Sequence, residues 1–165
     1  MNKMQKNLRG LTRGALVGAL YVALTYLSAL MGLSSGAIQV RFSEALCILP
    51  LFMPEAIPGL FIGCFIANLV TGGVILDVIF GSIATLIGAV GAYLLRKIPE
   101  KVKWLATLPT ILANALIVPP VLIYAYGVEM AYPLIVLTVA LGEIISCGVI
   151  GTMLYYSTKK LKIFK

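Results

Sequence analysis

Long apolar runs dominate this chain and most constrain its fold. An α-helix rises about 1.5 Å per residue, so a run of about 20 residues can cross the ~30 Å hydrocarbon core of a bilayer. Apolar residues make up 61% of the 165 residues, and the mean hydropathy is +1.04, far above that of a soluble domain. We therefore predict one all-α integral membrane domain over residues 1–165. Its clearest spans are residues 11–31, 76–95, 105–126 and 132–156.

The positive charges are confined to the ends of these runs. Every Lys and Arg except Arg41 lies in one of three segments, at residues 3–13, 96–103 and 159–165. Basic clusters that flank apolar spans are typical of cytoplasmic loops and of contacts with anionic lipid headgroups. Membrane topology therefore explains the net charge of +7, and we expect no nucleic-acid binding.

The stretch at residues 42–72 is interrupted by three prolines, Pro50, Pro54 and Pro58. A proline removes a helix hydrogen bond, although it suits the first turn of a new helix. We therefore predict a short helix at residues 42–53 and another at 57–71. The first of these is short for a span, so it must cross where the bilayer is thin or be covered by its neighbours.

The basic segments then determine the topology. If all three basic segments lie in the cytoplasm, an even number of spans must separate the first segment from the second. Dividing residues 42–72 into two helices gives four spans between them, which is even. Two further spans lead to the basic tail. We predict six transmembrane helices with both termini in the cytoplasm, and outer loops at residues 32–41, 72–76 and 127–131.

Several classes of function are excluded by what the chain lacks. It has no histidine, and Cys47, Cys64 and Cys147 are isolated in apolar stretches, so we expect no metal site and no cofactor. It contains no glycine-rich phosphate loop and no Ser/His pair. We therefore expect a protein that is not an enzyme and that takes any energy for transport from another subunit.

Three carboxylates, Glu44, Asp77 and Glu143, occur within the predicted spans. A charge in hydrocarbon is costly unless it faces a partner or a polar cavity, so these positions mark a candidate ligand site. For Glu44 an ion pair with Arg41 is an alternative, and for Asp77 an N-cap at the start of its helix. Glu143 has neither alternative and lies roughly 16 Å along its helix, so ligand binding explains it better.

Asn68 and Asn114 add amide groups to this set, and Arg41 is the one cation predicted on the outer side. Amides offer donors and acceptors, which suits the edge of a purine-like base, although hydrogen bonds between helices would explain them as well. Most of these polar groups fall in the outer halves of their helices. We therefore predict an outward-facing ligand cavity that includes Arg41, Asn68, Asn114 and the three carboxylates.

The first predicted helix carries small residues on one face, because Ala15, Ala19 and Ala23 are four positions apart. Small side chains at this spacing let another helix approach closely. The face can pack against the protein's own helices, or it can dock onto a partner membrane protein.

The segment from Arg41 to Asn68 resembles the QueT family, proposed queuosine-precursor binding subunits of energy-coupling factor transporters. The residues that carry the resemblance are Arg-Phe-Ser-Glu-Ala-Leu at 41–46, Leu49-Pro50, Pro54, Ala-Ile-Pro-Gly-Leu at 56–60, Gly63-Cys64, Ala67-Asn68, and then Asp77, Gly81 and Thr85. Over the rest of the chain the resemblance is mainly one of length and hydropathy.

The resemblance implies a substrate-binding subunit, or S component, in a bacterial cell membrane. Such a subunit would capture a 7-deazaguanine base from outside. It would associate with a transmembrane coupling protein and two cytoplasmic ATPases, whose ATP hydrolysis would drive inward release. The surface that S components use for docking is similar to the face formed by Ala15, Ala19 and Ala23.

The chemistry of a deazaguanine ligand fits the candidate residues. Its Watson–Crick edge has adjacent N–H donors that Glu143 or Glu44 could accept. Its carbonyl needs a donor, for which Asn68 or Arg41 would serve. A cationic aminomethyl arm would favour a second acid such as Asp77.

Three other functions remain open at this point. The protein could be an S component for another vitamin or small molecule, since two acids and two amides do not identify a ligand. It could be a cation-coupled secondary carrier, which also needs buried carboxylates. It could also be a purely structural membrane subunit that assembles through its small-residue faces.

Overall fold

The computed structural model describes residues 2–33 and 38–161, and these form helices and connecting turns without a strand. The order of the elements is α1 (Lys3–Leu30), η1 (Phe42–Leu51), α2 (Ala56–Val70), α3 (Ile75–Leu94), η2 (Leu95–Lys97), η3 (Glu100–Thr107), α4 (Leu108–Tyr126), α5 (Tyr132–Glu143), η4 (Ile144–Gly151) and α6 (Thr152–Leu161). Element η2 directly follows α3, η3 directly precedes α4, and α5, η4 and α6 follow one another without a break. Counted as continuous segments, the described residues therefore form the six helical segments predicted from the sequence.

Four of these segments are long and apolar enough to cross a membrane: Asn7–Leu30, Ile75–Lys97, Glu100–Tyr126 and Tyr132–Lys160. The span predicted at residues 11–31 overlaps the first of these, although the helix that contains it, α1, begins earlier, at Lys3. No proline interrupts the polar residues before the apolar run, so the helical backbone continues through them. Part of the outer loop predicted at residues 32–41 lies outside the described residues.

The second predicted helix, η1, is a 3₁₀-helix that ends at Leu51 rather than an α-helix. At about 2.0 Å per residue, its ten residues span only about 20 Å. Residues 43–50 are all buried, and η1 is packed against α1, α3 and η4. Longer helices therefore cover the short segment, so that it does not face lipid along its length. Cover by neighbouring helices is one of the two arrangements predicted for it, the other being a crossing where the bilayer is thin.

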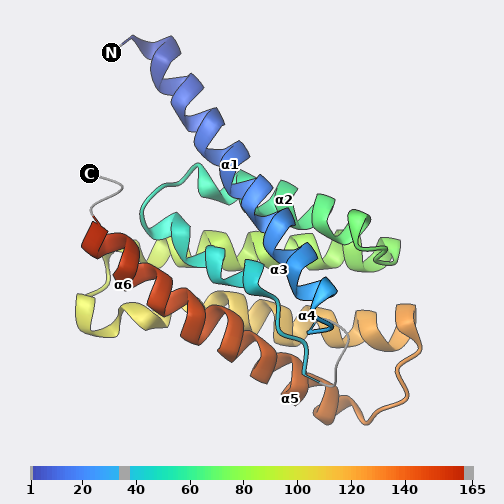
Figure 1. Cartoon of the computed structure of the whole chain (residues 1–165). Helices are drawn as coiled ribbons and strands as arrows, with labels where there is room; N and C mark the ends of the chain where they lie inside the picture. The colour runs from blue at the N-terminus through green and yellow to red at the C-terminus, as the bar shows by residue number, and fades with distance from the viewer. Residues whose placement is uncertain (1, 34–37, 162–165) are drawn as a thin grey trace.

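The remaining helices pack in chain order, α1 against α2, α2 against α3, α3 against α4 and α4 against α5. Figure 1 shows that α6 ends near η2 and η3 on the left of the view, and that α1 begins on the same side but projects away from the bundle, while the α2–α3 and α4–α5 connections lie on the right. The described parts of the three basic segments therefore lie on one side, and these two connections, both predicted as outer loops, lie on the other.

Candidate functional site

A small cavity lies where η1 and the chain segment before it meet α2, α3, α4 and α5. Its volume is about 20 Å³, which is close to the space that one water needs. Among the charged and amide residues predicted for the site, Arg41, Glu44, Asn114 and Glu143 line it. The remaining lining residues are Gln39, Cys64, Gly81, Thr85, Val118 and Val139.

Glu44 is held in place by donors from two helices. Its side chain is 2% exposed, the hydroxyl of Tyr21 on α1 donates to Oε1, and the thiol of Cys47 donates to Oε2 at 3.3 Å. One turn further along α1, Thr25 donates to the hydroxyl of Ser43 at 2.7 Å. The hydrogen bonds from Tyr21 and Cys47 replace part of the hydration that the buried Glu44 carboxylate loses.

Glu143 is the last residue of α5, and η4 continues the same helix with π-helical hydrogen bonding. Its side chain is 8% exposed, and Oε2 is buried without a hydrogen-bond partner among the described residues. The neighbouring Gly142 lets the backbone of Gln39 come close, because a Cβ atom there would overlap the Gln39 carbonyl oxygen. Glu143 therefore offers an unused acceptor at the cavity wall.

Arg41 joins the segment before η1 to α2 and α3. Its Nη1 donates to Oδ1 of Asn68 at 3.3 Å, and its Nη2 lies 3.8 Å from Oδ2 of Asp77. The hydroxyl of Tyr126 donates to the same carboxylate oxygen at 3.1 Å. The alternative interpretations of the two acids are therefore wrong: Arg41 pairs with Asp77 and not with Glu44, and Val74 rather than Asp77 is the N-cap of α3.

The two predicted amides take different positions. Asn114 lines the cavity beside Glu143, and its Nδ2 donates to the carbonyl oxygen of Thr110 at 3.2 Å. Asn68 is not among the lining residues, and it reaches the site through its contact with Arg41. The predicted set thus divides into residues that face the cavity and residues that hold Arg41.

Sequence reasoning missed Tyr21 and the hydroxyl residues that follow it on α1. Thr25 and Ser28 lie four and seven positions after Tyr21, and all three are buried. Each contacts the region of η1, since the hydroxyl of Ser28 accepts the backbone N–H of Phe42 at 2.9 Å. The helical spacing of these three polar residues is the signal that could have predicted a polar stretch on one face of the first helix.

A second hollow lies along the earlier turns of α1, between α1 and α2. This groove of about 930 Å³ is lined by Ala15 and Ala19, but not by Ala23, so the last residue of the predicted docking face lies outside it. At its floor the helices touch through glycine, because a Cβ on Gly59 would overlap the backbone of Gly14. Glu55 also lines the groove, and its Oε2 is buried without a partner among the described residues.

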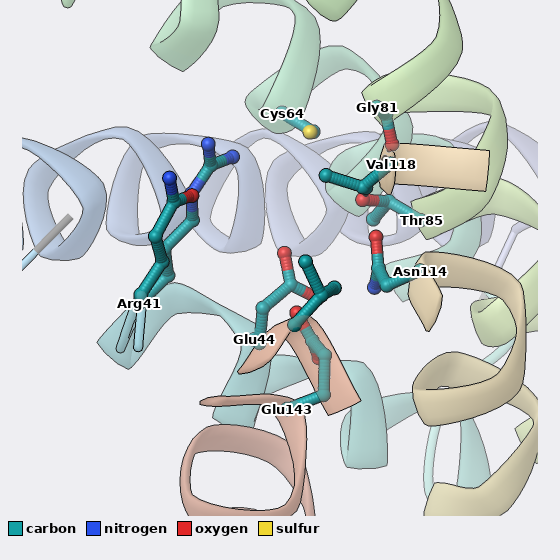
Figure 2. Close-up of a pocket in the computed structure, with 10 residues that line it drawn as sticks. Arg41, Glu44, Cys64, Gly81, Thr85, Asn114, Val118 and Glu143 are labelled. Carbon is teal, nitrogen blue, oxygen red and sulfur yellow. Dashed lines mark hydrogen bonds between the residues drawn. The ribbon is translucent and has the colours of Figure 1, made fainter. Parts of the chain in front are cut away.

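Figure 2 shows the residues of the cavity together. Glu44 rises from η1 and Glu143 from α5, so that the two carboxylates lie side by side, while the Arg41 guanidinium is set apart from them. Asn114 and Thr85 occupy the other side of the cavity. The cavity is thus lined by two acids, two amide residues and the guanidinium that Asp77 holds, an arrangement that suits a polar ligand rich in hydrogen-bond donors.

Comparisons with known proteins are consistent with this arrangement. The model of the family described as QueT transporter matches residues 11–160. The protein named queuosine precursor transporter QueT from Lactococcus lactis subsp. cremoris (strain MG1363) is 37% identical over 91 residues, which cover 54% of this chain and 53% of that relative. The chain thus spans about half the length of this curated relative. No solved structure matches the chain.

Proposed function

Because the chain belongs to the QueT transporter family, a family of multi-pass membrane transport proteins, we propose that it is the S component of an energy-coupling factor importer. It captures a queuosine precursor with a 7-deazaguanine base outside the cell. It delivers that base inward when it is coupled to a transmembrane protein and two ATPases. The single observation that carries the ligand part of this proposal is the unpartnered carboxylate oxygen of Glu143 at the wall of a polar cavity.

Glu143 accepts the Watson–Crick edge of the base. The ring N–H and the exocyclic amine of a deazaguanine are adjacent donors in one plane, which a carboxylate accepts with both oxygens. Arg41 lines the same cavity and donates to the carbonyl of the base, and Asn68 holds its guanidinium in position. Asn114, beside Glu143, supplies an amide for the remaining polar edge.

The cavity has to widen when the base enters, since its volume of about 20 Å³ suits one water. Arg41 is the natural point of opening. Apart from the ion pair with Asp77, it is held by a hydrogen bond to Asn68 and by its backbone N–H, which donates to the hydroxyl of Ser146 at 3.1 Å. A bound base can replace the first of these bonds with its own carbonyl.

The orientation in a bacterial cell membrane follows from the basic segments. Basic residues near the ends of spans favour the cytoplasmic side, so the end of the bundle that holds η2 and η3 faces the cytoplasm, together with both termini. The loop before η1 and the connections after α2 and α4 then face outward. In this orientation the cavity opens to the outside, where Arg41 lies at its mouth.

The groove between α1 and α2 docks the transmembrane coupling protein. Ala15 and Ala19 expose small side chains along it, which lets a partner helix approach closely in lipid. The unpartnered oxygen of Glu55 in the same groove favours a partner helix that carries a basic residue. The partner thus meets the earlier turns of α1, and the ligand site adjoins its later turns.

The ligand part is tested by purifying the protein in detergent and identifying small molecules that copurify by mass spectrometry, followed by titration of 7-deazaguanine bases. We expect one such base to bind and to raise the thermal unfolding temperature. Glu143→Gln should weaken binding by about tenfold or more, since a hydrogen bond to a charged group contributes about 1.5–3 kcal/mol. Glu129→Gln is the matched control, because it removes a carboxylate from an exposed loop.

Two results would contradict the proposal. Failure of every 7-deazaguanine base to bind would exclude the proposed ligand, and a vitamin found instead would identify an S component of different specificity. Uptake that persists in cells without the ATPase subunits would favour a cation-coupled carrier.

A further inference from the structure

The cavity region carries more negative than positive charge. Three acids, Glu44, Asp77 and Glu143, face or adjoin it, whereas Arg41 is the one cation among its described residues. Arg41 and Asp77 form an ion pair, and Tyr126 supplies Asp77 with a further donor. This group is therefore internally balanced, and it leaves two acids without an ion-pair partner among the described residues, with Arg41 as the nearby cation that Asp77 already pairs.

Glu44 and Glu143 form that unbalanced pair. Among the described residues, no Lys or Arg nitrogen lies within 4.0 Å of the carboxylate oxygens of either acid. They are 2% and 8% exposed, and Figure 2 shows them adjacent at one side of the cavity. Two adjacent carboxylates removed from water repel each other, and a cation between or beside them relieves that repulsion.

The two acids are not equivalent as acceptors. Oε2 of Glu143 has no hydrogen-bond partner among the described residues, so this carboxylate can receive a planar edge with two donors. Both oxygens of Glu44 already accept a hydrogen bond, one from Tyr21 and one from Cys47. Each oxygen of Glu44 therefore has only its remaining lone pair free. These lone pairs suit a primary ammonium, a compact charge whose N–H donors can rotate, better than the planar edge of a base.

We propose that Glu44 pairs with a primary ammonium group on the ligand, so that the site selects a 7-deazaguanine carrying a cationic aminomethyl arm over the same base with an uncharged substituent. This inference rests on the proposed function, since it assumes that the ring binds at Glu143. The second acid is then Glu44 and not Asp77, because Asp77 is neutralised by Arg41. Binding of the cationic base offsets one of the two unbalanced charges.

The test compares two probes that share the ring and differ in charge, 7-aminomethyl-7-deazaguanine and 7-cyano-7-deazaguanine. Their dissociation constants are measured by isothermal titration calorimetry on the full chain in lipid nanodiscs at pH 7. We expect the unaltered protein to bind the aminomethyl base about tenfold or more tightly than the cyano base, as a charged hydrogen bond in a buried site implies. This ratio requires no variant, so it remains decisive even if a substitution impairs folding.

The variants then assign the preference to one acid. Glu44→Gln should remove most of the preference by weakening the aminomethyl base while changing the cyano base by less than about threefold. Glu143→Gln should weaken both bases by a similar factor, and Glu129→Gln should change neither. Thermal unfolding of each variant without ligand shows whether its fold is retained.

The outcomes separate this inference from the proposed function. If neither base binds the unaltered protein, the proposed function fails. If both bind with equal affinity, the proposed function stands and the charge selection is wrong. If the preference survives Glu44→Gln in a folded protein, the ammonium binds elsewhere and the assignment to Glu44 is overturned.

Discussion

The two halves of α1 make contact on different principles. In the later turns, Tyr21, Thr25 and Ser28 contact the region of η1 through side-chain hydrogen bonds. In the earlier turns, Gly14 and Gly18 touch α2 through backbone atoms, with Gly59 and Gly63 opposite them. All five residues share one face of the helix. The later half reaches the cavity through Glu44, and the earlier half forms the floor of the groove. One helix therefore connects the proposed ligand site to the proposed docking surface.

The two halves differ in how well they tolerate substitution. A hydrogen bond between side chains can be removed while the backbones stay in place, so its loss costs about 1 kcal/mol. Backbone atoms in direct contact cannot make room for a methyl group unless the helices separate. We therefore expect substitutions along the groove to affect folding and assembly, and substitutions in the later half to affect ligand affinity first.

The largest effect is predicted for Gly59→Ala. The new methyl group would overlap the backbone of Gly14, so α1 and α2 must separate, which we expect to destabilise the protein by about 3 kcal/mol or to prevent folding. Gly148→Ala is the matched control, because its methyl group would lie 3.7 Å from the nearest atom, Cδ1 of Ile111. Thermal unfolding and the yield of monodisperse protein measure both; equal behaviour of the two variants would refute the backbone contact.

A smaller effect is predicted for Ala19→Leu, which fills the groove without touching the cavity. We expect association with the coupling protein to weaken by about tenfold, because overpacking costs about 1–3 kcal/mol, while ligand affinity stays unchanged. Ala23→Leu is the same substitution on an exposed position of α1 outside the groove. Copurification with the transport complex and uptake measure the effect, and a loss with Ala23→Leu alone would move the docking surface off the groove.

The six helical segments could be predicted because each long apolar run has one physical solution in lipid. The 3₁₀ geometry of η1 could not, since ten apolar residues containing Pro50 do not distinguish one helical period from another. The early start of α1 at Lys3 was missed for a related reason: hydropathy locates the membrane, and a helix can extend beyond it.

The candidate site shows the same limit at the level of side chains. Glu44, Glu143, Arg41 and Asn114 were recognised from their charge or polarity within apolar runs, and they line one cavity. The pairing of Arg41 could not be predicted, because spacing of three residues implies contact only within a helix. Arg41 precedes η1 in an extended conformation, with φ −114° and ψ 110°, which directs its side chain to Asp77.

The smallest effect is predicted for Tyr21→Phe, which removes the hydroxyl that donates to Glu44 and keeps the ring in the core. We expect the free energy of unfolding to fall by about 1 kcal/mol and ligand affinity to fall by a few-fold, since Glu44 loses one positioning donor. Tyr26→Phe removes the same hydroxyl from an exposed position on α1 and should change neither. Association with the coupling protein should stay the same in both variants, because the groove is untouched. A loss of association with Tyr21→Phe would mean that the two halves of α1 are energetically coupled, and that ligand and partner act on each other through Tyr21.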